Sequence, residues 1–274
     1  MEFWNNIYSH FDPVAFHIES IAVHWYGIMY ALALVTGITT AHWIVKKDKL
    51  PITNDQLDSY IWWVEIGIIL GARLGYIIFY DTHTMYYLTH PWQIFNPFSS
   101  DGTFVGISGM SYHGALIGFI IASYLWCKKN NKSFLFMGDL AALSVPLAYV
   151  FGRIGNFVNQ ELVGRVTDVS WGIYVGGILR HPSALYEAVL EGLFVFLILF
   201  YYRRKKAFDG QLGLMYIFLY ALARIIAENY RQPDPQLGYL LGTNWLTMGI
   251  LISALFIFVT LIGYIWLQRQ SRQS

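Results

Sequence analysis

The 274-residue sequence has few charged residues, a single cysteine and no lysine or arginine before residue 46. Charged residues make up 13% of the chain, whereas an average globular protein has about 25%. So few charges cannot cover a surface that faces water. The composition therefore excludes a soluble enzyme, a disordered scaffold and a nucleic-acid-binding protein. The one cysteine, Cys127, excludes a disulfide framework and a cysteine-based zinc site, and we interpret it as a small buried apolar residue.

Two further absences concern charge. The net charge is +1, so no overall field attracts a polyanion. Since the first 45 residues contain neither lysine nor arginine, they lack the positive segment that a cleavable signal peptide requires, and we expect none.

Long apolar runs are abundant. Hydrophobic residues are 56% of the chain, and the mean hydropathy is +0.44. A helix needs about 20 mostly apolar residues to cross a bilayer. The sequence predicts seven such spans, at 20–45, 57–80, 112–127, 136–158, 182–202, 211–231 and 245–267. The expected fold is an all-α integral membrane protein, a bundle of about seven transmembrane helices in one polytopic domain over 1–274.

The basic residues predict the orientation of this bundle. Twelve of the 18 follow the first, third, fifth and seventh spans: Lys46, Lys47, Lys49, Lys128, Lys129, Lys132, Arg203, Arg204, Lys205, Lys206, Arg269 and Arg272. All of them then lie on one side, which the positive-inside rule identifies as cytoplasmic. We therefore expect an outer N-terminus and a cytoplasmic C-terminus.

The other six basic residues are all arginines: Arg73, Arg153, Arg165, Arg180, Arg224 and Arg231. Arg73, Arg153 and Arg224 interrupt apolar helices, where each costs roughly 2.5–3.5 kcal/mol on the insertion scale. One interpretation is a set of internal ion pairs, Arg224 with Glu228 and Arg153 with Glu161 or another acid. The other is a shared anion site, because guanidinium groups bind phosphate through two parallel hydrogen bonds. The abundant membrane anion is a phospholipid headgroup.

Three polar segments fall on the predicted outer side. The longest, GRIGNFVNQELVGR at 152–165, combines hydrogen-bond donors with glycines that permit close backbone approach, and it is typical of a binding cradle. The second, SYHG at 111–114, opens the third span. The third, HPS at 181–183, opens the fifth span, where we expect Ser183 to cap the helix. Their common depth predicts a single site near the outer leaflet.

In these segments the chain resembles the prolipoprotein diacylglyceryl transferase family of bacterial inner membranes. The likeness continues through FDPV at 11–14, HWYGIMY at 24–30, GARLGY at 71–76, GMSYHG at 109–114, RIIAE at 224–228 and RQPD at 231–234. Two positions depart from the family pattern. Ala115 replaces a second glycine, and Ala184 replaces a glutamine, which changes the fine shape of the expected site.

The resemblance implies an activity. Such enzymes move the diacylglyceryl group of phosphatidylglycerol to the thiol of the lipobox cysteine in a prelipoprotein signal peptide. A thioether forms and glycerol phosphate leaves. The expected partners are phosphatidylglycerol, the prelipoprotein signal peptide and the bilayer, with no metal or cofactor and no nucleic acid. The expected location is the bacterial inner membrane, with a periplasmic N-terminus, a cytoplasmic C-terminus and a short periplasmic segment near 159–181.

The resemblance also suggests roles for single residues. His113 is the expected proton acceptor, because imidazole titrates near neutral pH; alternatively, it only orders a helix entry. Arg153 and Arg224 are expected to hold the phosphate, while Asn156 and Tyr26 orient the glyceryl carbon. The catalytic candidates are thus His113, Arg153, Arg224 and Tyr26, and the substrate-binding candidates are Arg73, Arg153, Asn156, Glu161, Gly164, Arg224, Glu228 and Arg231.

Several of these candidates have a second interpretation. Without the resemblance, Tyr26 is one more interfacial tyrosine. Glu161 and Glu228 are expected to hold arginines in place, and Gly164 is expected to matter through backbone space. Two rival functions remain at this stage: an anion or lipid transporter, and a phospholipid-binding membrane protein without catalysis.

Overall fold

The computed structural model describes residues 1–18, 21–82, 84–98, 102, 106, 109–233 and 238–273, and these residues are mostly helical. The long helices are α2 (Trp25–Asp48), α3 (Asn54–Phe79), α5 (Tyr112–Asn130), α6 (Phe134–Val158), α9 (Gln211–Glu228) and α10 (Met248–Ser271). A further long helical segment joins α7 (Ser183–Glu187), a π-helical stretch η3 (Ala188–Phe194) and α8 (Val195–Tyr202). Asp234, part of the last quoted motif, lies outside the described residues.

Six helices in the described ranges are long and apolar enough to cross a membrane. They are α2, α3, α6, α9, α10 and the joined segment Ser183–Lys205. Helix α5 has 19 residues but is not among the six. The prediction of a helical membrane protein with several spans is confirmed, and the count of seven and the orientation stay predictions.

The remaining elements are short. They are α1 (Glu2–Asn5), η1 (Ile7–His10), β1 (Val14–Ile18), β2 (Ile21–His24), α4 (Thr84–Thr89), η2 (Pro91–Phe95), β3 (Ile173–Val175), β4 (Ile178–Arg180), η4 (Arg203–Lys205) and η5 (Leu240–Gly242). β1 pairs with β2 and β3 pairs with β4, each as a two-stranded antiparallel sheet. Among the described residues no sheet closes on itself.

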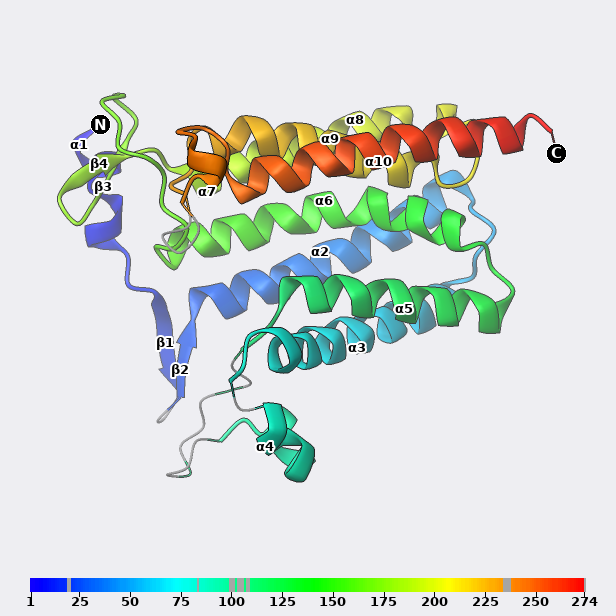
Figure 1. Cartoon of the computed structure of the whole chain (residues 1–274), viewed down its shortest axis with the longest axis horizontal. Helices are drawn as coiled ribbons and strands as arrows, with labels where there is room; N and C mark the ends of the chain where they lie inside the picture. The colour runs from blue at the N-terminus through cyan, green and yellow to red at the C-terminus, as the bar shows by residue number, and fades with distance from the viewer. Residues whose placement is uncertain are drawn as a thin grey trace. The chain divides into compact units, whose positions relative to one another are not determined.

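The chain divides into two compact units, residues 48–137 and residues 1–47 with 138–274. In the unit 48–137, α3 and α5 lie side by side (Figure 1). Glycines make this contact close: a Cβ atom on Gly71 would lie 2.3 Å from the carbonyl oxygen of Gly114, and one on Gly67 would lie 2.7 Å from that of Gly118. The four-residue glycine spacing of α3 is therefore a packing motif, as expected for helices in lipid.

In the other unit, α9 lies along α10, and the two chain ends are at opposite ends of the helices (Figure 1). At the end near the C-terminus, Trp43 of α2 stacks on Phe200 of α8, and the Lys47 ammonium lies over both rings. Two of the basic clusters that predicted the cytoplasmic side thus meet at one end of this unit.

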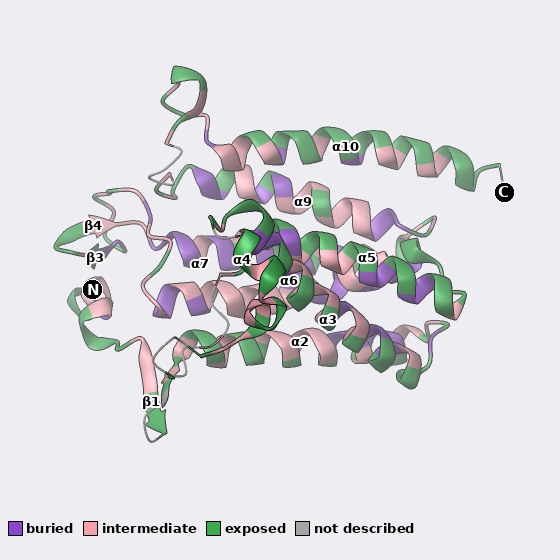
Figure 2. Ribbon diagram, turned by 60° about the horizontal axis from the view of Figure 1, so that its bottom comes forward, coloured by how far each residue is buried: buried purple, intermediate pink, exposed green. Residues whose placement is uncertain are grey.

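Burial is uneven along these helices (Figure 2). Only Ser253 and Thr260 of α10 are buried, and large apolar side chains such as Phe258 and Trp266 are exposed. This is the pattern of a helix that faces lipid, since apolar surface needs no protein cover there.

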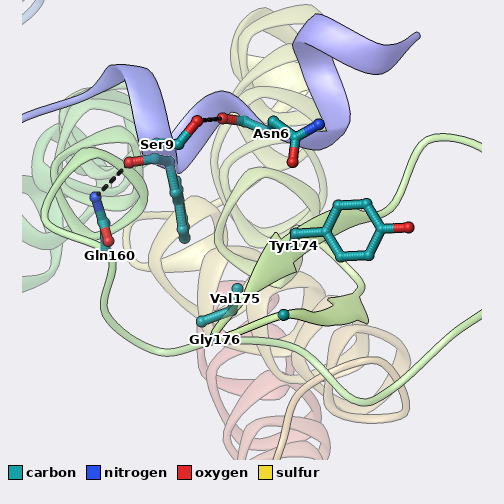
Figure 3. A pocket seen from close by; sticks show the side chains of 8 residues that line it. Asn6, Ser9, Gln160, Tyr174, Val175 and Gly176 are labelled. Carbon is teal, nitrogen blue, oxygen red and sulfur yellow. Dashed lines mark hydrogen bonds between the residues drawn. The ribbon is translucent and has the colours of Figure 1, made fainter.

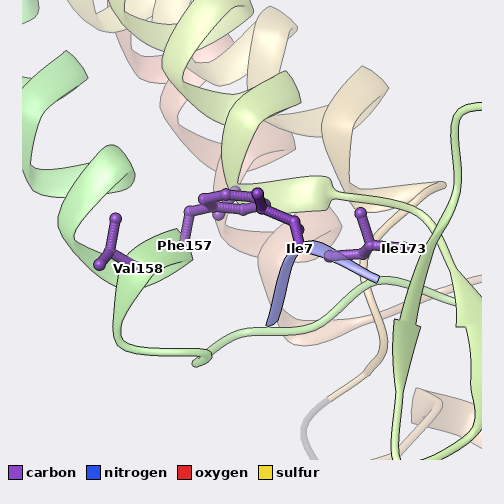
Figure 4. Close-up of a cluster of buried hydrophobic side chains, with 5 residues drawn as sticks. Ile7, Phe157, Val158 and Ile173 are labelled. Atoms are coloured by element: carbon purple, nitrogen blue, oxygen red, sulfur yellow. The ribbon is translucent and has the colours of Figure 1, made fainter. Parts of the chain in front are cut away.

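A small apolar core lies at the other end of the unit, near the N-terminus. Ile7, Phe157, Val158, Ile173 and Ala184 are buried together (Figure 4). They come from η1, the end of α6, β3 and α7, so the N-terminal segment and the β3–β4 hairpin are packed against the start of the polar segment 152–165. This core fixes where the predicted cradle begins.

Candidate active site

Three buried glutamates and three arginines meet in the unit formed by 1–47 and 138–274. Glu187, Glu191 and Glu228 have exposed fractions of 0%, 0% and 5%, and their cationic partners are Arg153, Arg224 and Arg231. The three arginines come from different segments of the sequence, and the buried carboxylates hold them close together in the structure.

Glu187 is the centre of this cluster. Its Oε2 atom lies 3.0 Å from Nε of Arg153 and 3.3 Å from Nη1 of Arg224. Its Oε1 atom accepts a hydrogen bond of 3.3 Å from Nη1 of Arg231. One carboxylate thus joins α6, α9 and the turn after α9.

Glu191 lies farther from the same arginines. Its carboxylate is 3.5 Å from Nη1 of Arg224 and 3.9 Å from Nη2 of Arg153. The Tyr149 hydroxyl donates a hydrogen bond to Glu191 and accepts one of 2.5 Å from Nε of Arg153. The Arg153 guanidinium also lies over the Tyr149 ring, 4.7 Å from its centroid.

The pair of Arg224 and Glu228, one turn apart on α9, is confirmed. Nη2 of Arg224 and Oε2 of Glu228 are 2.7 Å apart, and the Thr247 hydroxyl donates to Glu228 over 2.9 Å. A Cβ atom on Gly249 would lie 2.9 Å from this carboxylate. The start of α10 is thereby held closely against the cluster.

Glu187 and Glu191 were not among the predicted site residues. The signal was present: two glutamates four residues apart in an apolar span require partners. Their placement depends on the π-helical stretch η3, a deviation that often marks functional sites. Gly192 permits it, because a Cβ atom there would lie 2.6 Å from Cγ2 of Val150.

The polar segment after Arg153 forms a chain of neutral and charged groups. Nη1 of Arg153 donates to Asn156 over 3.3 Å, and Nδ2 of Asn156 donates to Glu161 over 3.3 Å. Asn159 also donates to Glu161. Glu161 therefore binds two asparagines, and the acid that pairs with Arg153 is Glu187.

Tyr26 lies beside this segment. A Cβ atom on Gly155 would lie 3.3 Å from the Tyr26 ring and 3.1 Å from Met29, so α2 packs on α6 at this turn. Tyr26 is 43% exposed, which leaves its ring accessible next to Asn156.

Gly164 has a backbone role, as expected. A Cβ atom there would lie 2.2 Å from the carbonyl oxygen of His181, and Gly164 pairs with Arg231 in an isolated β-bridge. The Arg165 guanidinium donates to the carbonyls of Arg231 and Glu228. These contacts bind the segment 152–165 to the end of α9.

The expected helix cap at Ser183 is wrong. The hydroxyl of Ser183 donates to the carbonyl oxygen of Leu162 over 2.9 Å, and α7 starts after Pro182 without a side-chain cap. Ser183 therefore joins the HPS segment to the polar segment instead of stabilising the helix start.

Burial also lowers the pKa of the nearby His181 imidazole, and the negative charge of Asp168 offsets part of this shift. Its Nδ1 atom lies 3.2 Å from the Tyr186 hydroxyl. This shift favours the neutral form of the His181 ring at pH 7.

Arg73 and His113 belong to the unit 48–137 and have their own neighbours there. Arg73 is 6% exposed; it donates to the carbonyls of Ile94 (2.5 Å) and Gly109 (3.2 Å). His113 is exposed in the first turn of α5, and its Nδ1 atom lies 3.4 Å from the Tyr80 hydroxyl. The Arg73 guanidinium also lies over the rings of Tyr76 and Tyr87, 5.7 Å and 5.6 Å from their centroids.

A pocket of about 500 Å³ lies between the N-terminal segment and the β3–β4 hairpin (Figure 3). It is lined by Asn6, Tyr8, Ser9, Gln160, Tyr174, Val175, Gly176 and Gly177. Gln160 donates to the carbonyls of Tyr8 and Phe11, each over 3.2 Å, and burial raises the pKa of the Tyr8 hydroxyl. None of the predicted site residues lines this pocket.

Comparison with known proteins gives one family. The model of the family described as prolipoprotein diacylglyceryl transferase matches residues 13–266. Relatives named phosphatidylglycerol–prolipoprotein diacylglyceryl transferase are 69% identical in Aliarcobacter butzleri, over 270 residues, and 59% identical in Wolinella succinogenes, over 269 residues. A third, from Campylobacter curvus, is 57% identical over 269 residues. Each alignment covers 98% of this chain and 98% of the relative.

Proposed function

Because the chain belongs to the prolipoprotein diacylglyceryl transferase family, we propose that it transfers the diacylglyceryl group of phosphatidylglycerol to a cysteine thiol of prolipoproteins. It is a multi-pass transferase of the bacterial inner membrane and acts in the first step of lipoprotein maturation. The acceptor is the lipobox cysteine of the signal peptide.

The reaction makes and breaks one bond at the glyceryl carbon. The peptide sulfur forms a carbon–sulfur bond, and the bond from that carbon to the phosphate oxygen breaks. The electron pair of the broken bond leaves with glycerol phosphate, and the thiol proton passes to a base. The enzyme must therefore stabilise charge on the phosphate and accept a proton.

The observation that carries this proposal is the gathering of Arg153 and Arg224 around Glu187. Their side chains are 15% and 14% exposed, so the cluster is accessible at its edge. Buried carboxylates hold both guanidinium groups in place before a ligand arrives. Groups positioned in advance stabilise a developing charge without a reorganisation cost. In this role Arg153 and Arg224 hold the headgroup phosphate.

The other predicted residues have supporting roles in this function. Asn156 and Tyr26 orient the glyceryl carbon, and Arg73 and Arg231 add positive charge toward the substrate. Glu161 acts through the two asparagines that donate to it. Glu228 fixes Arg224, and Gly164 permits the close approach to His181.

His113 is proposed as the base. It is exposed at the helix start, and its imidazole is a side chain that can accept the proton of a thiol. The competing interpretation, a histidine that only orders the helix entry, is separated from this one by the pH dependence of transfer given in the Discussion.

We also propose seven spans over a single polytopic domain, with a periplasmic N-terminus, a cytoplasmic C-terminus and a short periplasmic segment near 159–181. In a Cys127→Ala background, Asp12→Cys should react with a membrane-impermeant maleimide added to spheroplasts, whereas Ser271→Cys should react only after lysis. The reverse pattern contradicts the orientation.

The activity is tested by a mass measurement. Membranes that contain the protein and phosphatidylglycerol should add one diacylglyceryl group to a lipobox peptide, and a matched peptide with serine in place of cysteine should stay unmodified. A chelator should change nothing. Lipid binding without a mass change supports a non-catalytic lipid-binding protein, and anion counterflow in proteoliposomes supports a transporter.

A further inference from the structure

The ion pairs of the arginine–glutamate cluster join equal numbers of positive and negative groups before any substrate binds. In the described part of the chain, Arg153, Arg224 and Arg231 face three carboxylates, those of Glu187, Glu191 and Glu228. A phosphodiester headgroup adds one negative charge. In an apolar setting an uncompensated charge is costly, and titratable groups respond by changing protonation. Binding of the headgroup must therefore be accompanied by a compensating change.

The three carboxylates are held unequally. The closest arginine nitrogen is 2.7 Å away from Glu228 and 3.0 Å away from Glu187. For Glu191 the shortest such distance is 3.5 Å. Coulomb energy falls with separation, so neutralising Glu191 weakens the ion pairs of the cluster least.

The surroundings of Glu191 also suit a neutral acid. Tyr149 and Arg153 face it from α6, Glu187 from the preceding turn and Arg224 from α9. Tyr220 of α9 contacts the Tyr149 ring. The hydrogen-bond donor to Glu191 is the neutral Tyr149 hydroxyl, which can also accept a hydrogen bond from a carboxylic acid. Glu187, in contrast, is bonded to charged donors.

We propose that Glu191 takes up a proton from the solvent when the phosphate headgroup binds. The inference rests on the proposed function and names a positioning residue for it. The one bond formed is the O–H bond of the carboxylic acid. Once neutral, Glu191 no longer offsets the charge of Arg224 and Arg153, so that their guanidinium groups, still held by Glu187 and Glu228, attract the phosphate more strongly.

Calorimetry tests this coupling. Phosphatidylglycerol in detergent micelles is titrated into the full-length protein at pH 7, without peptide, in two buffers of different ionisation heat. The native protein should take up about one proton per bound lipid, since one added charge is balanced by one proton. Glu191→Gln should bind the lipid with no proton uptake. Asp209→Asn is the matched control, because it neutralises a carboxylate outside the cluster, one that contacts Lys206, and it should keep the uptake.

Kinetics give a second readout. The KM for phosphatidylglycerol should rise with pH in the native enzyme and stay flat in Glu191→Gln. Glu191→Asp, which keeps a titratable group, should retain the slope. If Glu191→Gln fails to fold, as judged by gel filtration, the Glu191→Asp slope and the native proton count still decide.

Several outcomes overturn the proposal. They are lipid binding by the native protein without proton uptake, undiminished uptake by Glu191→Gln, and uptake with glycerol phosphate alone but not with the lipid. The failure of the proposed function looks different: the lipid binds with normal proton uptake, but the lipobox peptide is never modified.

Discussion

The Glu187 carboxylate lies 3.0 Å from Nε of Arg153, and the two residues come from different helices, α7 and α6. Glu187 is fully buried. Removing one partner of a buried ion pair leaves an uncompensated charge and typically costs about 3–5 kcal/mol. This is a large part of the free energy of unfolding of a domain. The pair therefore both stabilises the helix packing and fixes the direction of the Arg153 guanidinium.

The first prediction concerns the shape of the Arg153 head group. Arg153→Lys keeps the charge but removes the planar fork that contacts Glu187, Tyr149 and Asn156. Transfer of the diacylglyceryl group to a lipobox peptide should fall by about 100-fold or more. Removing a hydrogen-bond donor that stabilises charge in a transition state has an effect of this size in other enzymes. The rate in membranes with equal amounts of protein is the measurement.

Its control is Arg269→Lys, at the end of α10, which should keep full activity. Equal insertion of both variants, followed by protease accessibility, separates chemistry from folding. Undiminished transfer by Arg153→Lys contradicts the assignment of Arg153 as a phosphate-holding residue.

The second prediction separates the two interpretations of His113. His113→Gln should lower transfer at least about tenfold at neutral pH, the low end of general-base effects. Since the substrate thiol ionises with a pKa of about 8.5, raising the pH to 9 should restore part of the rate. His10→Gln, at an exposed position at the end of η1, should leave the profile unchanged. A loss that is independent of pH assigns the base to another group.

The third prediction tests the close approach at Gly164. Gly164→Ala places a Cβ atom 2.2 Å from the His181 carbonyl oxygen, so the backbone must move, at a cost of about 1–3 kcal/mol. The melting temperature and transfer activity should both fall. Gly138→Ala meets nothing within 4 Å and should behave as the native protein. Equal behaviour of the two variants would mean that the segment 152–165 adapts freely.

The fourth prediction concerns the contact between α3 and α5. In Gly71→Ala the new Cβ atom would lie 2.3 Å from the Gly114 carbonyl oxygen, which separates the helices and removes their packing energy. A lower melting temperature in detergent is expected. Gly27→Ala, with nothing within 4 Å, is the control. An unchanged melting temperature in Gly71→Ala would contradict the close packing of these helices.

The fifth prediction concerns the start of α9. Asp139 of α6 is 2% exposed and accepts from the backbone N–H groups of Gly210 and Gly213, each over 2.9 Å. It acts as a cap supplied by another helix and also pairs with Lys206 over 3.0 Å, so Asp139→Ala should cost more than the roughly 1 kcal/mol of a helix cap alone. Asp209→Ala removes only the contact of a more exposed carboxylate with Lys206 and should cost less. Chemical denaturation in detergent ranks the two.

The sequence alone determined the membrane class and the approximate positions of six long apolar helices, because hydropathy is a local property that depends on composition over about 20 residues. It also identified Arg153 and Arg224 as residues in need of partners, because charge in an apolar helix is costly wherever the helix lies. The motifs around them led to the family, which the comparisons confirmed.

Only the tertiary structure decided which partners these arginines have. Arg224 pairs with Glu228 one turn away, a contact that helix periodicity predicts. Arg153, in contrast, pairs with Glu187 instead of the nearby Glu161. That choice depends on how α6 and α7 face each other. Such rotations come from packing between distant segments, which no local pattern records.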